Sequence, residues 1–374
     1  MHEGARNDLG PLWRSTDRAR LGFGAWAVGG AGWGEEESAA EREGAVRAAA
    51  DRGVTVFDTA PTYGNGESER VLGRALAGRR DQVAIATKVG PRDDPRDSLE
   101  ESLRRLRSDY VDLVQLHEAL ERWEWRLEGL HQLQIAGKAR AVGLCNATHL
   151  QLERAVQIAP VVSYQGPYNL FDRDVEERLL PLCRQAGLGF LAYRPLASGL
   201  LGGTYTEAPR FSEGDHRRQL YYFKGREFER RRQVIERLRP VAARAGVSLV
   251  RLALSWLLSR SGVTVVLAGV RNRSQAEELF APDTRLLTPE TVVQIDATVT
   301  DAFRLPRATP AARTQAATWG ERERFIVERL DGAGSAEAIA AAWTDRGEQP
   351  MIAAQVKVFA DQLAERDLAV PDDG

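Results

Sequence analysis

The sequence is poor in cysteine, in net charge and in long apolar runs. Cys145 and Cys183 are the only cysteines among 374 residues, which excludes a disulfide framework and favours a reducing compartment. A formal net charge of −2 gives no electrostatic reason to expect nucleic acid or an anionic membrane as a partner. No apolar run approaches the ~18 residues that a membrane-spanning helix needs. The N-terminal segment, residues 1–20, has no apolar signal core, so we expect a cytoplasmic protein.

What the sequence does contain is apolar material, 43% of its residues, in strand-like and helix-like segments that alternate from Leu21 to Phe280. The predicted strands are Leu21–Trp26, Val54–Asp58, Gln82–Lys88, Asp109–His117, Arg140–Cys145, Val161–Gln165, Leu188–Tyr193 and Val263–Ala268. The predicted helices are Ser38–Asp51, Glu67–Gly78, Asp97–Arg107, Glu121–Gly137, Leu150–Ile158, Val175–Ala186, Glu227–Ala245, Ser248–Ser259 and Ser274–Phe280. Eight such units over roughly 260 residues favour an α/β fold of the closed (β/α)8 TIM-barrel type.

Ionisable side chains stand where successive predicted strands end. Asp58, Lys88 and His117 close three of them, and Tyr63 lies in the loop after Asp58. Each alone has an ordinary reading, as a cap, a surface lysine, a core histidine or a packed tyrosine. Because the carboxyl ends of barrel strands form one rim, and that rim carries the chemistry of such folds, we expect the four to lie together.

Together these residues suit proton transfer to an oxygen atom. A buried lysine needs an anionic partner, which Asp58 supplies. The cation is expected to lower the pKa of Tyr63 from about 10 toward a useful range. His117 can hydrogen-bond a substrate oxygen or assist the tyrosine. The set can therefore protonate a carbonyl oxygen as hydride arrives at the carbon.

From about Leu21 to Arg304 the sequence resembles the aldo-keto reductase superfamily. Asp58, Tyr63, Lys88 and His117 match that family's catalytic tetrad in order, spacing and context. The matching phrases are Phe57-Asp58-Thr59-Ala60, Tyr63-Gly64, Thr87-Lys88 and Leu116-His117. Two further phrases make it most similar to the bacterial branch related to potassium-channel β subunits and general-stress reductases. These are Gly24-Ala25-Trp26-Ala27-Val28-Gly29-Gly30 and Phe211-Ser212-Glu213-Gly214-Asp215-His216-Arg217.

The resemblance implies NADPH (or NADP) bound across the rim without a dinucleotide-binding domain. It implies that Asn146 and Gln165 hydrogen-bond the carboxamide of the nicotinamide. It also implies that the ring of Tyr193 stacks on the nicotinamide ring. The other contacts to the cofactor would come from three places: the loop after the first strand, the segment that wraps the pyrophosphate, and the segment around the adenosine 2′-phosphate. The residues implied there are Ala25, Trp26, Arg194, Pro195, Leu196, Ser198, Gly199, Leu200, Gly269, Arg271, Arg273, Gln275 and Glu278. Arginine suits bidentate phosphate contacts, and Arg271 and Arg273 flank a helix start, although solvated loop arginines would look the same.

Three positions depart from the family pattern. Cys145 replaces the usual serine before Asn146, and a thiol is a weak hydrogen-bond donor. Arg194 replaces a small residue, so it could contact the pyrophosphate or reach toward an anionic substrate. Leu279 replaces an asparagine near the adenine. The substrate pocket is predicted from aromatic and catalytic residues: Trp26, Trp33, Tyr63, His117 and Trp123, with the excursion from Arg194 to Gly225. No metal ligand set is predicted.

About seventy residues follow the predicted barrel, residues 21–304. Residues 305–318 are read as a linker and residues 319–374 as a helical module with helices at Glu321–Leu330, Ser335–Thr344 and Pro350–Arg366, and a short strand at Leu368–Val370. Its phrase Arg329-Leu330-Asp331-Gly332 resembles winged-helix-like peptide carriers. Helices that pack on the barrel or at a subunit contact are the alternative. Twelve acidic against six basic residues from Trp319 onward argue against DNA binding.

Two functions follow from these expectations. The first is reduction of an aldehyde or ketone, such as a sugar or secondary-metabolite carbonyl, by NADPH with Tyr63 as general acid. The second is a cofactor-sensing or scaffolding subunit that binds NADPH with little turnover and acts through a protein partner on the C-terminal module.

Overall fold

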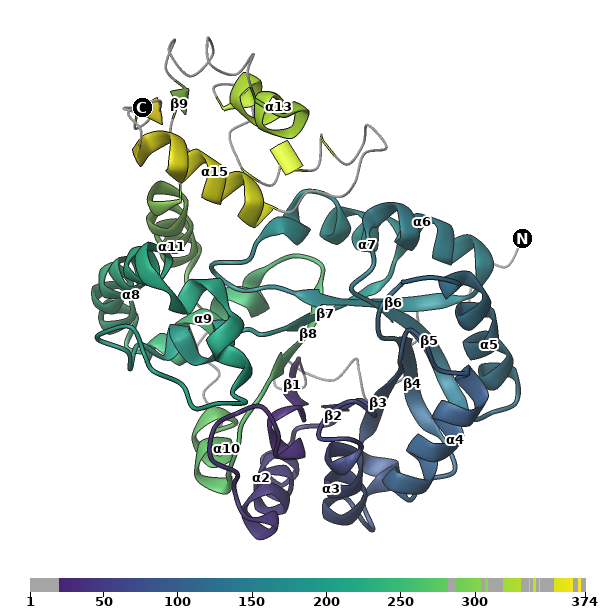
Figure 1. Cartoon of the computed structure of the whole chain (residues 1–374). Helices are drawn as coiled ribbons and strands as arrows, with labels where there is room; N and C mark the ends of the chain where they lie inside the picture. The colour runs from purple at the N-terminus through teal and green to yellow at the C-terminus, as the bar shows by residue number, and fades with distance from the viewer. Residues whose placement is uncertain are drawn as a thin grey trace. The chain divides into compact units, whose positions relative to one another are not determined.

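The fold is a closed eight-stranded parallel barrel in a computed structural model, which describes residues 20–281, 287–303, 307–308, 319–330, 336, 339–340, 343, 353–365 and 369–370. The strands pair in chain order, and β1 closes the barrel against β8 (Figure 1). They are β1 (Leu21–Gly24), β2 (Val56–Asp58), β3 (Ala84–Val89), β4 (Val111–Leu116), β5 (Ala139–Cys145), β6 (Val161–Pro167), β7 (Gly189–Tyr193) and β8 (Val263–Ala268). The predicted (β/α)8 fold is confirmed.

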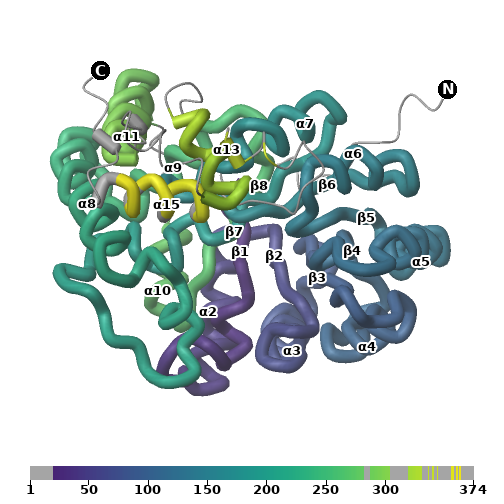
Figure 2. The backbone as a smooth tube through the Cα atoms, turned by 45° about the horizontal axis from the view of Figure 1, so that its top comes forward, coloured from purple at the N-terminus to yellow at the C-terminus, as the bar shows by residue number. Residues whose placement is uncertain are grey.

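Helices surround the barrel as an outer layer, visible in the tube of Figure 2. They are α2 (Ala39–Asp51), α3 (Glu67–Ala75), α4 (Pro95–Leu106), α5 (Trp123–Ile135), α6 (His149–Ile158), α7 (Leu179–Ala186), α8 (Gly225–Ala245), α9 (Leu249–Ser259) and α10 (Arg273–Leu279). Helix α11 (Pro289–Ala302) follows α10 in the chain. Short 3₁₀ turns are η1 (Ala27–Gly29), η2 (Arg80–Gln82), η3 (Asp174–Glu176), η4 (Ala197–Gly202), η5 (His216–Gln219) and η6 (Tyr221–Phe223). Among the described residues no single helix could cross a membrane; α8 and α9 meet the length and composition requirement only as a pair bent by 83°.

The barrel interior is filled by small and branched side chains that point inward from successive strands. They are Val56, Ala84, Ala86, Leu113, Ala141, Val162, Leu191, Val265 and Leu267, with Tyr193 partly buried against them. These residues pack the space below the rim, so the barrel is a filled core and its carboxyl end is left to carry polar groups.

The start of α4 and the presence of α11 differ from the sequence prediction for local reasons. Helix α4 begins at Pro95, two residues early, because the Asp94 carboxylate accepts from the backbone N–H groups of Arg96 and Asp97 at 3.0 and 3.1 Å. This is an aspartate N-cap followed by proline at the first helical position. Helix α11 was not predicted at all. Its start combines Pro289 with Thr288, whose Oγ1 accepts from the Thr291 N–H at 3.3 Å.

The chain divides into two compact units, Met1–Val293 and Gln294–Gly374, and the division falls inside α11. It lies ten or so residues before the boundary at 304 expected from the sequence. The second unit contains α13 (Glu321–Arg329), α15 (Ala353–Glu365) and an antiparallel pair of short strands, β9 (Arg307–Ala308) and β10 (Ala369–Val370). Strand β10 was predicted; β9 was assigned to the linker.

The second unit has a hydrophobic core of its own. It consists of Phe325, Ile326, Val327, Leu330, Ala336, Ile339, Ala340, Trp343, Val356, Ala360 and Leu363, with Trp319 and Phe359 partly buried against it. Its residues come from α13 and α15 and from the chain between these two helices. Ser335 and Pro350, the predicted start residues of the second and third helices, lie outside the described residues, as do residues 1–19 and most of the predicted linker. The winged-helix-like assignment stays a prediction.

Candidate active site

The loop that carries Tyr63 is fixed by an exceptionally close approach between two backbone segments. Gly64 has φ +58°, and a Cβ atom there would lie 2.0 Å from the carbonyl oxygen of Gly29. Only glycine fits such a position. The loop therefore packs directly on the turn η1, which follows β1. The ring of Tyr63 stacks on Trp26 with 5.9 Å between centroids.

Asp58 and Lys88 form a buried ion pair at the ends of β2 and β3. Lys88 Nζ donates to Asp58 Oδ1 at 2.7 Å and to the carbonyl oxygen of Thr59 at 2.8 Å, and the lysine is 1% exposed. Burial alone would lower the pKa of Lys88, but the charge of Asp58 outweighs it and the pKa lies above its ordinary value. Lys88 is therefore a permanent cation, and its Nζ lies 5.0 Å from the centroid of the Tyr63 ring.

Tyr63 differs from the expectation in its ionisation. Burial raises its pKa to about 12, although Lys88 acts in the predicted, lowering direction. Burial is the larger effect because a phenolate loses more hydration than one nearby cation restores. Tyr63 is therefore a protonated phenol at neutral pH, which suits a proton donor.

His117 follows β4 directly and faces the same rim. Its ring centroid lies 5.9 Å from that of Tyr63, in an edge-on arrangement. Burial and then the charge of Lys88 lower the pKa of His117 to about 3. The imidazole is therefore neutral, so it can donate one hydrogen bond to an oxygen atom without adding charge. The four predicted residues thus lie together.

Two predicted cofactor residues take part in hydrogen bonds of the site itself. Gln165 Nε2 donates to Asp58 Oδ2 at 2.8 Å, from β6 on the far side of the barrel. Asn146 adopts φ +53°, donates to the carbonyl oxygen of His117 at 3.1 Å, and accepts from the Tyr193 hydroxyl at 2.9 Å. The sequence did not predict any of these three contacts. Together they hold the rim residues in one arrangement.

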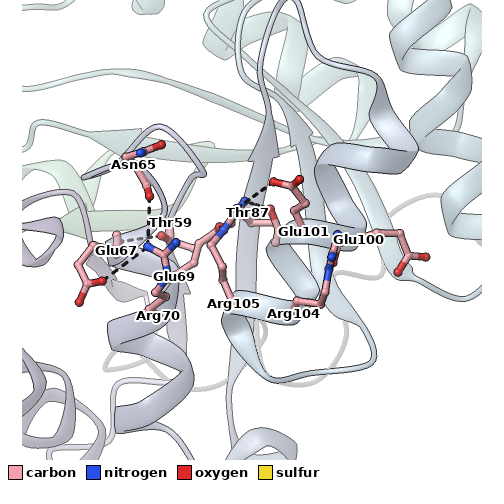
Figure 3. A network of polar contacts seen from close by, with 12 residues as sticks. Thr59, Asn65, Glu67, Glu69, Arg70, Thr87, Glu100, Glu101, Arg104 and Arg105 are labelled. Carbon is pink, nitrogen blue, oxygen red and sulfur yellow. Dashed lines mark hydrogen bonds and ion pairs between the residues drawn. The ribbon is translucent and has the colours of Figure 1, made fainter.

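A second polar network lies on the opposite face of β3 (Figure 3). Glu69 of α3 accepts from Thr87 Oγ1 at 2.6 Å and from Arg105 Nε, at the end of α4, at 2.6 Å. Glu69 is completely buried. Adjacent residues of a strand point to opposite faces, so the side chain of Thr87 points to the surrounding helices while that of Lys88 points to the rim.

One cavity of about 690 Å³ joins the tetrad to the start of α10. Most of the predicted site residues line it: Ala25, Trp26, Trp33, Asp58, Tyr63, His117, Asn146, Gln165, Tyr193, Arg194, Pro195, Leu196, Ser198, Gly199, Gly269, Arg271 and Gln275. Lining residues outside the predicted set are Gly24, Ala27, Thr62, Glu118, Thr204, Tyr205, Arg217 and Leu267. Several of these are sequence neighbours of strand-end residues, and Thr204, Tyr205 and Arg217 belong to the long excursion that the sequence already marked.

Five predicted residues do not line the cavity: Lys88, Leu200, Arg273, Glu278 and Trp123. Lys88 lies beneath it, against Asp58. Trp123 is the first residue of α5 in the outer layer. Its backbone N–H donates to the carbonyl oxygen of Leu120 at 3.0 Å. Arg273 donates to Glu277 at 2.8 Å on the surface. A position at the start of the helix that follows a strand is therefore not enough to place a side chain at the rim.

The excursion packs an aromatic cluster beside the tetrad. His216 contacts Trp26 and Trp33 with ring centroids 4.4 and 4.2 Å apart, and its Nδ1 is 2.7 Å from the carbonyl oxygen of Gly32. Arg217 pairs with Asp215 at 2.6 Å. The cluster closes the side of the cavity that adjoins Tyr63.

The positions that depart from the family pattern are also placed. Burial raises the pKa of the Cys145 thiol, so it stays protonated beside the tetrad. Leu279 is buried at the end of α10. Arg271 pairs with Glu37 at 3.7 Å and also donates to the carbonyl oxygen of Glu35. Of the two arginines expected near an adenosine phosphate, Arg271 is thus engaged by the segment before α2.

A closed parallel barrel with a lysine–aspartate pair, a phenol and a neutral imidazole at its rim defines a class of oxidoreductase barrels. The model of the aldo/keto reductase family matches residues 20–300. The chain belongs to that family, and the predicted resemblance is confirmed.

Relatives of the expected branch are among the matches. The chain is 36% identical over 280 residues to aldo-keto reductase YhdN of Bacillus subtilis, with 70% of this chain and 84% of that protein covered. It is 33% identical over 312 residues to a probable voltage-gated potassium channel subunit beta of Oryza sativa, covering 75% and 93%. A solved aldo-keto reductase from Klebsiella pneumoniae, in complex with NADPH, superposes with a TM-score of 0.58 at 27% identity and covers 74% of this chain and 89% of that one.

Proposed function

We propose that this protein reduces an aldehyde or ketone to the alcohol with NADPH as the reductant. The observation that carries the proposal is the geometry of the rim, where the ring of a protonated Tyr63 lies 5.0 Å from the cation of Lys88 and 5.9 Å from the neutral ring of His117. A group that must give a proton to a developing alkoxide needs that protonation state.

Each rim residue has a separate role in this reaction. His117 would donate a hydrogen bond to the carbonyl oxygen and orient it. Tyr63 would transfer its phenolic proton to that oxygen, and Lys88 would stabilise the phenolate that remains. Asp58 holds Lys88 in place, and Gln165 holds Asp58 through the 2.8 Å hydrogen bond.

The cavity suits an extended dinucleotide. It runs from the amides of Asn146 and Gln165 to Arg271 and Gln275. Between them the backbone is left-handed at Arg194, Ala197, Ser198 and Gly199, with φ values of +53°, +48°, +55° and +95°. Such conformations cost about 1 kcal/mol or more each in non-glycine residues and concentrate at ligand sites. When bound, the nicotinamide would supply the hydride that reaches the carbonyl carbon. The Klebsiella pneumoniae neighbour, solved with NADPH, supports this choice of cofactor.

Replacement of Tyr63 by phenylalanine tests the proposal. We expect kcat for carbonyl reduction to fall by about 10²- to 10⁴-fold, because general-acid assistance is lost. The Kd for NADPH, followed by tryptophan fluorescence, should change little. Turnover is measured as NADPH oxidation against a panel of aldehydes, ketones and keto-sugars. Unchanged kcat in Tyr63→Phe would refute the role of Tyr63 as the acid.

A second candidate is a cofactor-sensing or scaffolding subunit. The similarity to a probable channel subunit and the separate core of the second unit favour it. It requires tight NADPH binding, negligible turnover on the whole panel, and a protein partner that is lost when residues 319–374 are deleted. Turnover that survives the deletion, without any partner recovered, would exclude it.

A further inference from the structure

The cations around the cavity differ in whether a carboxylate neutralises them. Three are paired: Lys88 with Asp58 at 2.7 Å, Arg217 with Asp215 at 2.6 Å, and Arg271 with Glu37 at 3.7 Å. Arg194 also lines the cavity, but among the described residues no carboxylate lies within ion-pair distance of it. Its Nε is buried without a hydrogen-bond partner. A buried N–H of a cation without an acceptor is costly, so a ligand that supplies one gains affinity.

The backbone of Arg194 is fixed, which restricts where its side chain can reach. The residue directly follows β7 and has φ +53°. Its carbonyl oxygen accepts from Asn169 Nδ2 at 3.1 Å and from the Ala197 N–H at 3.0 Å. Asn169 is completely buried and its other amide contacts are to Asp172 and Phe171. The guanidinium group is therefore presented from a rigid support.

The neighbours of Arg194 place its charge on the side of the cavity that adjoins the tetrad. Its guanidinium carbon lies 5.7 Å from the centroid of the Tyr193 ring. The same charge contributes, after burial, to a lowered pKa of His216, which contacts Trp26. The ring of Trp26 stacks on Tyr63. Two further buried nitrogen atoms of the aromatic cluster, Trp33 Nε1 and His216 Nε2, also have no hydrogen-bond partner.

We propose that Arg194 binds an anionic group of the substrate, so that the preferred substrates are aldehydes or ketones that carry a carboxylate or phosphate at the end remote from the carbonyl. This inference rests on the proposed reductase function and names the substrate class of that site. The planar guanidinium matches either anion with two parallel hydrogen bonds. The cofactor pyrophosphate is a second source of the same chemistry, and the test separates the two.

The test compares two aldehydes of similar size, succinic semialdehyde, which carries a carboxylate, and butanal, which carries none. We expect kcat/KM of the full-length protein to favour succinic semialdehyde. In Arg194→Gln the ratio of the two kcat/KM values should fall by about 10- to 100-fold, mainly through the KM of succinic semialdehyde. Arg194→Lys keeps the charge but loses the two parallel N–H donors of the guanidinium, and it should give an intermediate ratio of the two kcat/KM values. Arg218→Gln removes an exposed arginine of the same excursion outside the cavity lining and should leave the ratio unchanged.

Two measurements distinguish the alternatives. If Arg194→Gln slows both aldehydes equally and raises the Kd for NADPH, Arg194 binds the pyrophosphate and the inference is wrong. Binding of succinic semialdehyde to the NADP⁺ complex, followed by fluorescence, requires no turnover. Weaker binding in Arg194→Gln than in the wild type supports the anion site even if neither aldehyde is reduced, in which case the proposed function alone fails. Equal binding by both proteins overturns the anion site.

Discussion

The two faces of strand β3 each contact a buried carboxylate, and the two carboxylates serve different ends. On the rim face Lys88 binds Asp58, and on the helix face Thr87 and Arg105 bind Glu69. Both acids are buried, at 4% and 0% exposure. The two pairs differ in the group that each cation approaches next. Lys88 approaches a phenol that borders a cavity, whereas Arg105 continues to Glu101, a surface residue.

The comparison shows how one strand separates chemistry from support. Lys88 and Thr87 are adjacent in β3, so the Glu69 network anchors the strand that carries Lys88 without contacting Lys88 itself. The rim pair works through the charge it holds next to Tyr63, and the outer pair works by joining β3 to α3 and α4. A buried ion pair adds little net stability compared with apolar packing, yet loss of one partner is expensive. Substitutions on the two faces should therefore differ in activity more than in stability.

The largest effect is expected for Lys88→Met. Loss of the cation beside Tyr63 should lower kcat by about 10³-fold, because the phenolate that forms on proton transfer is no longer stabilised. The measurement is single-turnover reduction at saturating NADPH, with far-UV circular dichroism to establish folding. Lys88→Arg retains charge and serves as the control. If the activity per folded molecule of Lys88→Met is near that of the wild type, the rim pair is merely structural and the contrast between the two faces disappears.

A smaller effect on activity and a clear effect on stability are expected for Glu69→Ala. Arg105 and Thr87 lose their shared acceptor, so we expect the free energy of unfolding to fall by about 3–5 kcal/mol. Urea denaturation measures the loss, and kcat of the folded fraction should stay within a few-fold. Glu101→Ala is the matched control: Glu101 contacts the same arginine at 3.2 Å but is 59% exposed, so its removal should cost less than about 1 kcal/mol. Equal losses in both variants would contradict the assignment of the buried acid.

The sequence predicted those features that follow from strand position. Asp58, Lys88 and His117 each stand at a strand end, and parallel strands bring all their ends to one rim. Hydrogen bonds that depend on register across the barrel could not be predicted in this way. Gln165 meets Asp58 from β6, and Tyr193 meets Asn146, only because the closed barrel sets the neighbours of each strand.

Side chains in irregular segments were the hardest to place from sequence. Tyr205 and Arg217 reach the cavity from an excursion without periodicity, where packing among Tyr205, Phe211 and Phe223 determines the path. Trp123 was expected at the pocket and lies at the start of α5 instead. The ionisation of Tyr63 also depends on burial, which a sequence does not give. A nearby cation set the predicted direction, and desolvation reversed it.

The smallest expected effect concerns His117, through the pH dependence of stability. Its pKa is about 3 in the folded chain and about 6.5 when unfolded. The folded state therefore favours the neutral ring, and the stability it gains is present above pH 6.5 and is lost as pH falls toward 3. The expected slope is at most about 1.4 kcal/mol per pH unit. Urea denaturation of wild type and His117→Gln between pH 7.5 and 5 isolates this contribution from the other four histidines. Wild type should lose stability faster than the variant. The Lys88 charge adds to the effect of burial on the pKa of His117, so the difference in slope between wild type and His117→Gln should shrink in a Lys88→Met background. If stability falls in parallel with pH in wild type and His117→Gln, His117 is solvated at the rim and the prediction is wrong.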